Sequence, residues 1–132
     1  MNMTILFSQA LFLLVAVFGM QTPARSVWDA VYTEVQAKRG EETFSKSCAA
    51  CHDSSEFASP AFMKQWSGRT VFDLFDEISA VMPMDAPGKL EKQAYIDVVA
   101  FIFRCNSFPA GETELDLKEE NLRQIRIEAK GR

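Results

Sequence analysis

Cys48, Cys51 and His52 lie close together in the stretch "SKSCAACHDSS", which spans residues 45–55. His52 is the only histidine of the chain, and Cys105 is the only other cysteine. Two thiols and one imidazole at this spacing could serve dithiol redox exchange, zinc binding, a disulfide, or covalent haem attachment, for which C-x-x-C-H is the signature.

Haem attachment accounts for all three side chains without recruiting the distant Cys105. A redox dithiol is expected beside a βαβ pattern, which this sequence lacks. A zinc site needs four ligands and would have to recruit the distant Cys105. A disulfide between Cys48 and Cys51 would close a small strained ring and leave His52 without a role. In haem attachment, the thiols add to the two vinyl groups and the imidazole faces the iron. We favour haem, with zinc and thiol chemistry as open alternatives.

The N-terminal segment indicates export. Residues 1–24 contain no charged side chain, and Ile5 to Met20 is almost entirely apolar. This run is shorter than the roughly 20 residues of a membrane-spanning helix and is typical of a signal peptide. Small residues at Thr22 and Ala24 predict cleavage after Ala24, which leaves 25–132 as a single exported domain. The alternative is an uncleaved anchor. Export supports the haem interpretation, because covalent haem is attached outside the cytoplasm.

Helical periodicity predicts an all-α domain of about four to five helices around the motif. We expect a first helix in two pieces up to about Ser47, on two apolar stripes: Trp28, Val31, Tyr32 and Val35, then Ala37, Gly40, Phe44 and Cys48. Ser26 with Asp29 and Thr33 with Gln36 have the spacing of a capping box. No alternating pattern indicates a strand.

The second half of the domain contains two further strong helical patterns. Residues 53–69 carry Ser, Asp, Pro and Gly and predict mostly loop. A helix is expected near 71–80, where Thr70 and Asp73 repeat the capping-box spacing, and another from about Glu91 to Cys105. The segment "DLKEENLRQI" predicts a short last helix. Cys105 continues an apolar stripe, which favours a small buried side chain over a reactive thiol.

A haem iron bound by His52 has a second axial position to fill. Bis-histidine ligation within the chain is excluded, because no second histidine exists. Three methionines follow the N-terminal segment. Met63 lies in the apolar run "PAFMKQW" and fits a packing role. Met82 and Met84 lie in the proline-punctuated loop "VMPMDAPG", which could cover the far face of a haem.

From about Val27 to Ile127, the predicted mature chain resembles the small monohaem cytochromes c of the His/Met type. Gly40 and Phe44 before "CAACH" resemble that family's first helix, "VMPMDAPG" its methionine loop, and "YIDVVAFI" its last main helix. The resemblance is especially to bacterial cytochromes that serve periplasmic dehydrogenases. It implies a cytochrome c-like fold in which Gly40 and Phe44 pack on Val98 and Phe101.

The resemblance also implies a set of site residues. In such relatives the ligand methionine directly precedes the first proline of the loop, which selects Met82 as the sixth ligand, with Met84 as the fallback. Pro83 agrees with this, because it disfavours a helical conformation at residue 82. Further implied haem surroundings are Pro60, as the carbonyl that receives the histidine N–H, and Trp66 and Arg69, as propionate partners. For the last two, a half-buried Trp and a surface Arg are equally compatible readings.

The expected function is electron transfer rather than catalysis. We expect one covalently bound haem c per chain, a periplasmic location, a dehydrogenase as donor, and a terminal oxidase or another cytochrome as acceptor. The composition fits one globular domain: 132 residues, 48% hydrophobic and 24% charged. A net charge of −4 argues against nucleic acid as a partner. We expect a monomer without a stable membrane anchor. The alternative function is a gas-binding, sensing or peroxidase-like protein with a displaceable sixth ligand.

Overall fold

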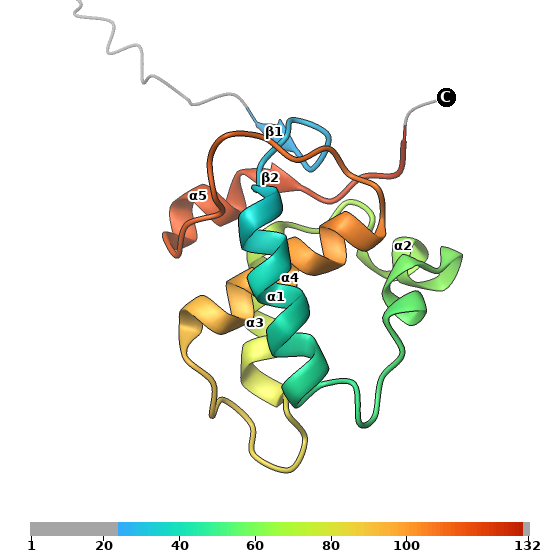
Figure 1. The fold of residues 1–132 in the computed structure, drawn as a ribbon. Helices are drawn as coiled ribbons and strands as arrows, with labels where there is room; N and C mark the ends of the chain where they lie inside the picture. Colours follow the sequence, from blue (N-terminus) through green and yellow to red (C-terminus); the bar gives the residue numbers. More distant parts are fainter. Residues whose placement is uncertain (1–23, 131–132) are drawn as a thin grey trace, which may run out of the picture.

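The computed structural model describes residues 24–130, and in this range the predicted all-α class is confirmed (Figure 1). Five α-helices carry the fold: α1 (Glu34–Ser47), α2 (Pro60–Trp66), α3 (Val71–Val81), α4 (Lys92–Cys105) and α5 (Glu119–Arg123). A 3-10 helix, η1 (Ser54–Ala58), precedes α2. Two short strands, β1 (Arg25–Ser26) and β2 (Ile125–Arg126), pair in parallel and bring the two ends of the domain together.

The centre of the fold is the crossing of α1 over α4 (Figure 1). A Cβ on Gly40 would overlap the carbonyl group of Asp97 and lie 2.9 Å from the Val98 nitrogen. One helical turn further, the rings of Phe44 and Phe101 lie with centroids 5.2 Å apart. The expected packing of Gly40 and Phe44 on α4 is therefore confirmed, and it explains a glycine that otherwise costs about 1 kcal/mol inside a helix.

The helix α4 is buried along most of its length. Every residue from Tyr95 to Phe103 is buried, and the helix packs against α1, α3 and η1. Its last residue, Cys105, is half-buried, and burial raises the pKa of its thiol. The helix α3 begins at a complete capping box, in which Thr70 and Asp73 each accept the other's backbone N–H. This helix was predicted within one residue at each end.

The expected first piece of helix α1, over residues 28–35, is wrong. The chain there forms a turn: the Ser26 N–H donates to Asp29 Oδ2 at 2.6 Å, and Ala30 has a φ of 53°. The helix begins only after Thr33, whose hydroxyl accepts the Gln36 N–H at 3.1 Å. Val35, assigned to a buried face, is 67% exposed.

The expected loop over residues 53–69 is also wrong in large part, since it holds η1 and α2. The polar residues that indicated loop are the caps of these short helices. Asp53 accepts the Ser55 N–H at 2.9 Å, and Ser59 accepts the Phe62 N–H at 3.2 Å. Pro60 occupies the first turn of α2, where its missing N–H costs nothing.

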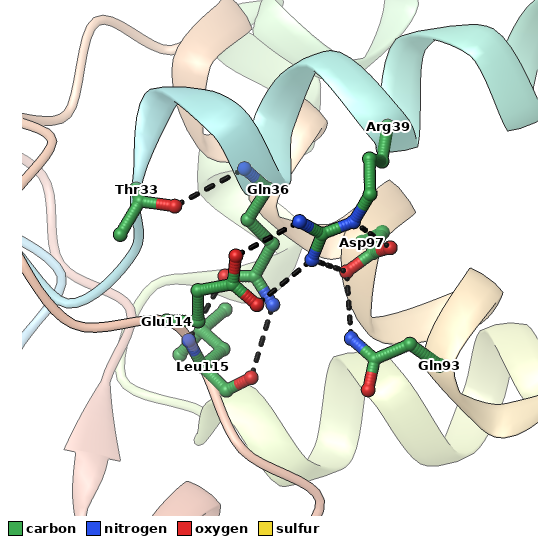
Figure 2. Close-up of polar contacts among 7 residues, drawn as sticks. All are labelled: Thr33, Gln36, Arg39, Gln93, Asp97, Glu114 and Leu115. Carbon is green, nitrogen blue, oxygen red and sulfur yellow. Dashed lines mark hydrogen bonds and ion pairs between the residues drawn. The ribbon is translucent and has the colours of Figure 1, made fainter.

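A polar network joins α1, α4 and the C-terminal segment beside the helix crossing (Figure 2). Arg39 pairs with both oxygens of Asp97, at 2.9 and 3.1 Å, and with both oxygens of Glu114, at 2.9 and 2.8 Å. The buried Gln36 side chain exchanges two hydrogen bonds with the backbone of Leu115. The guanidinium holds the pKa of the Glu114 carboxyl below its usual value. The Arg39–Asp97 pair ties α1 to α4, and the other contacts tie α1 to the C-terminal segment.

The predicted signal peptide, residues 1–24, lies outside the described residues except for Ala24, so both the cleavage and the 25–132 boundary stay predictions. Over the range that the structure describes, none of the helices combines the length and the apolar character that a bilayer crossing requires.

Candidate haem-binding site

A cavity of about 920 Å³ opens between the end of α1, the segment from η1 to α2, and the loop after α3. Its volume lies near the upper end of ordinary ligand pockets. The lining is rich in aliphatic and aromatic side chains, which include Phe44, Phe57, Phe62, Trp66, Leu74, Ile78, Val81, Val98 and Ile102. Cys48, Cys51, His52, Met82 and Met84 also line it. The fold therefore brings the C-x-x-C-H motif and the methionine loop to one cavity.

The motif forms a compact turn directly after α1. Cys48 is the C-cap residue, and its N–H donates to the Phe44 carbonyl at 2.8 Å. The N–H groups of Cys51 and His52 both donate to the Cys48 carbonyl, at 3.1 and 3.0 Å. Both thiols are free, with Cys48 half-buried and Cys51 exposed. Burial raises the pKa of the Cys48 thiol. The helix end thus delivers two thiols and one imidazole to the cavity within a single turn.

The imidazole of His52 is held by residues of η1. Its Nδ1 lies 3.4 Å from Glu56 Oε2, and its ring lies 5.5 Å from the Phe57 ring. Glu56 is in turn fixed by the Asp53 N–H, which donates to Oε1 at 3.0 Å. The pKa of Glu56 is held below its usual value, chiefly by that backbone N–H and then by His52.

The two loop methionines differ in exposure. Met82 caps α3 with an extended backbone, φ −118° and ψ 152°, as its place before Pro83 indicates, and it is half-buried. Met84 is 80% exposed. The Met82 carbonyl accepts the Tyr95 hydroxyl at 2.6 Å and the Gly88 N–H at 3.2 Å. The α4 helix therefore holds the backbone of residue 82 in place, whereas Met84 extends outward. Met63 is half-buried against the core and does not line the cavity.

Of the three further residues predicted to surround the haem, one lines the cavity and two do not. Trp66 is buried and lines the cavity. Arg69 lies outside the lining: its guanidinium stacks 4.1 Å from the centre of the Trp66 ring and lies 3.5 Å from Glu77. Pro60 is exposed at the start of α2, outside the lining, and the described acceptor near His52 is Glu56 instead.

Sequence reasoning missed the wall that η1 and α2 form. The rings of Phe44, Phe57, Phe62 and Trp66 follow one another at centroid distances of 5.8, 6.1 and 6.2 Å. It also missed Glu56 and the role of Tyr95. The Asp53–Glu56 spacing is that of a capping box, so this signal was present in the sequence.

A haem group fits the residues of this cavity. A half-open cavity of this size in an otherwise close-packed protein indicates space for a group that is not amino acid. Its walls are apolar and aromatic, and free thiols and an imidazole stand at its edge. Within residues 24–130, no three His, Cys, Asp or Glu side chains gather as a metal-ion site. The zinc set of Cys48, Cys51, His52 and Cys105 is thus not assembled in this range.

Comparison with known protein families identifies the segment that lines this cavity. The family model described as cytochrome C oxidase, cbb3-type, subunit III matches residues 35–102, which run from α1 to α4 and include every residue that lines the cavity. No curated protein matches the chain. No solved structure matches it either.

Proposed function

Because the chain belongs to the family described as cytochrome C oxidase, cbb3-type, subunit III, it is a c-type cytochrome, and we propose that it carries electrons on one haem bound through Cys48 and Cys51. The observation that carries this proposal is the cavity that brings the motif and Met82 together. A bound haem supplies the one-electron couple between Fe(II) and Fe(III). We propose His52 and Met82 as its two axial ligands.

The thiols of Cys48 and Cys51 are the groups that would bind the haem covalently. Cys48 and Cys51 would hold the haem as thioethers: each S–H would add across one vinyl double bond, sulfur to one carbon and hydrogen to the other, without an oxidant. The Cys48–His52 turn fixes the spacing of the two sulfur atoms from the imidazole. His52 would then bind the iron through Nε2, since Nδ1 faces Glu56.

Met82 would complete the coordination from the opposite loop. Its backbone is anchored through Tyr95 and Gly88, which favours it over the exposed Met84. If His52 and Met82 both bind the iron, no open position would remain for a substrate, as electron transfer rather than catalysis requires. Methionine ligation raises the reduction potential of a c-type haem, and the aromatic wall would cover one side of the group with apolar surface.

The proposed setting is the periplasm. The uncharged apolar N-terminus supports export through a signal peptide. The partners we propose are a periplasmic dehydrogenase as donor and a terminal oxidase or another cytochrome as acceptor. Val81 and Met84 are 48% and 80% exposed beside the cavity, and this apolar rim supports a contact surface for such partners.

The ligand assignment is tested by comparing Met82→Ala with Met84→Ala. The far-red charge-transfer band of an Fe–S(Met) bond should vanish in Met82→Ala only. In that variant the potential should fall, and carbon monoxide should bind the reduced haem. Loss of the band in Met84→Ala instead would move the ligand by two residues. A band that persists in both variants would assign the Fe–S bond to another methionine. Absence of the band from the unaltered protein would leave the sixth position to another group or open, as the gas-binding or peroxidase-like alternative requires.

A further inference from the structure

The Nδ1 atom of His52 faces a carboxylate. Glu56 Oε2 lies 3.4 Å away, and over residues 24–130 the structure gives this nitrogen no other hydrogen-bond partner. A histidine that binds a metal through one nitrogen donates the other N–H to an acceptor, and the charge of that acceptor tunes the basicity of the ring. The identity of the acceptor is therefore a property of the haem site.

The Glu56 carboxylate is held in position by η1. Its other oxygen accepts the Asp53 N–H at 3.0 Å, which closes the capping box of the 3-10 helix. The next residue, Phe57, has its carbonyl bound by the side chain of Asn106 at 2.7 Å. The end of α4 thus fixes η1, and η1 fixes the carboxylate beside His52.

We propose that Glu56 is a positioning residue of the haem site, which accepts the Nδ1–H of His52 and lowers the reduction potential of the iron. This rests on His52 as axial ligand, as proposed above. A carboxylate acceptor makes the imidazole a stronger electron donor than a neutral carbonyl acceptor does, because it stabilises positive charge on the ring. The stronger donor favours Fe(III) over Fe(II).

Exposure limits the size of this effect. The Glu56 side chain is 55% exposed and that of His52 is 31% exposed, so water screens the pair. The distance of 3.4 Å is also longer than the 2.7–2.9 Å of a strong charge-assisted bond. We expect the Fe(III)/Fe(II) equilibrium to shift by about tenfold when the charge is removed, which for a one-electron couple corresponds to about 59 mV.

Glu56→Gln is the variant that tests this, because it keeps the length of the side chain and an oxygen that can accept the Asp53 N–H. Glu77→Gln is the matched control: it removes one carboxylate from the lining of the same cavity, and its neighbour is Arg69 rather than His52. Spectroelectrochemical titration should show a potential raised by about 59 mV in Glu56→Gln and clearly less in Glu77→Gln. Equal shifts, or no shift in Glu56→Gln, would refute a specific role of the His52 contact.

A measurement on the unaltered protein tests the same contact without a variant that could misfold. His52 is the only histidine, so the NMR spectrum of ¹⁵N-histidine-labelled protein contains the signals of one imidazole. In the reduced protein, its Nδ1–H should be visible, shifted downfield and protected from exchange. An Nδ1–H that exchanges freely with water would overturn the proposal, while the haem spectrum remains that of a His-ligated cytochrome. A protein without attached haem would instead overturn the proposed function.

Discussion

Replacing Gly40 with alanine tests the helix crossing on which the site is built. A Cβ at residue 40 would overlap the Asp97 carbonyl and lie 2.9 Å from the Val98 nitrogen, where ordinary contacts begin at 3.4 Å. The obstacles are backbone atoms of α4, which cannot rotate away as a side chain can. To relieve the Val98 contact alone, the helices must separate by about half an ångström, and clearing the carbonyl requires more.

Two opposing terms set the change in the free energy of unfolding of Gly40→Ala. Alanine gains about 1 kcal/mol over glycine in helix propensity. Overpacking costs typically about 1–3 kcal/mol, and backbone clashes lie at the upper end. Separation of the helices also weakens the contact of Phe44 with Phe101 and the bidentate pair of Arg39 with Asp97. We expect a net loss of about 2–3 kcal/mol in the free energy of unfolding.

Urea unfolding of the haem protein, followed by circular dichroism, measures this loss. The control is a pair of variants at Lys38, an exposed position of the same helix. There, alanine should be more stable than glycine by about 1 kcal/mol. If Gly40→Ala is as stable as the natural protein, or gains stability as the Lys38 pair does, the close approach of α1 and α4 is refuted.

Three further sets of substitutions test other parts of the fold and the site. Arg39→Met should cost about 2–3 kcal/mol of unfolding free energy, because it leaves Asp97, whose side chain is 6% exposed, without its ion partner; urea unfolding within 0.5 kcal/mol of the natural protein would contradict this. Burial raises the pKa of Tyr32 to about 12 from its usual 10.0, so the stability that its neutral form contributes is present below pH 10 and is lost as the pH rises through about 12. Tyr32→Phe should flatten the fall of the denaturant midpoint over this alkaline range, and an unchanged slope would exclude Tyr32 as its source. Cys48→Ala combined with Cys51→Ala should give a haem-free chain of low helicity by circular dichroism, because the cavity walls lose the group they enclose; a cooperatively melting apo variant would show a self-sufficient core.

The elements that the sequence predicted well are those defined by local signals. The helix α3 has a capping box at its start and a proline after its end, and both are visible within a few residues of sequence. The helix α4 has a long apolar pattern that no short-range feature contradicts. The match of the family model from residue 35 to residue 102 agrees with the resemblance that the motif and the methionine loop indicated.

The errors arose where distant contacts or caps decide the structure. Residues 28–35 have a helical spacing of apolar side chains, yet the chain there turns and β1 pairs with β2, a partner one hundred residues away. In residues 53–69, Ser, Asp and Pro favour loops by composition, although the same residues begin short helices when they occupy cap positions. Glu56 was overlooked for this reason, because its role depends on the 3-10 helix that turns it toward His52.

The most direct test of the central claim is the intact mass of the purified protein after acid–acetone extraction and denaturation. We predict the mass of the chain plus one haem, with Cys105 as the single thiol that an alkylating reagent modifies. A haem-free mass with Cys48 and Cys51 both alkylated would contradict the assignment of this site as a covalent haem centre.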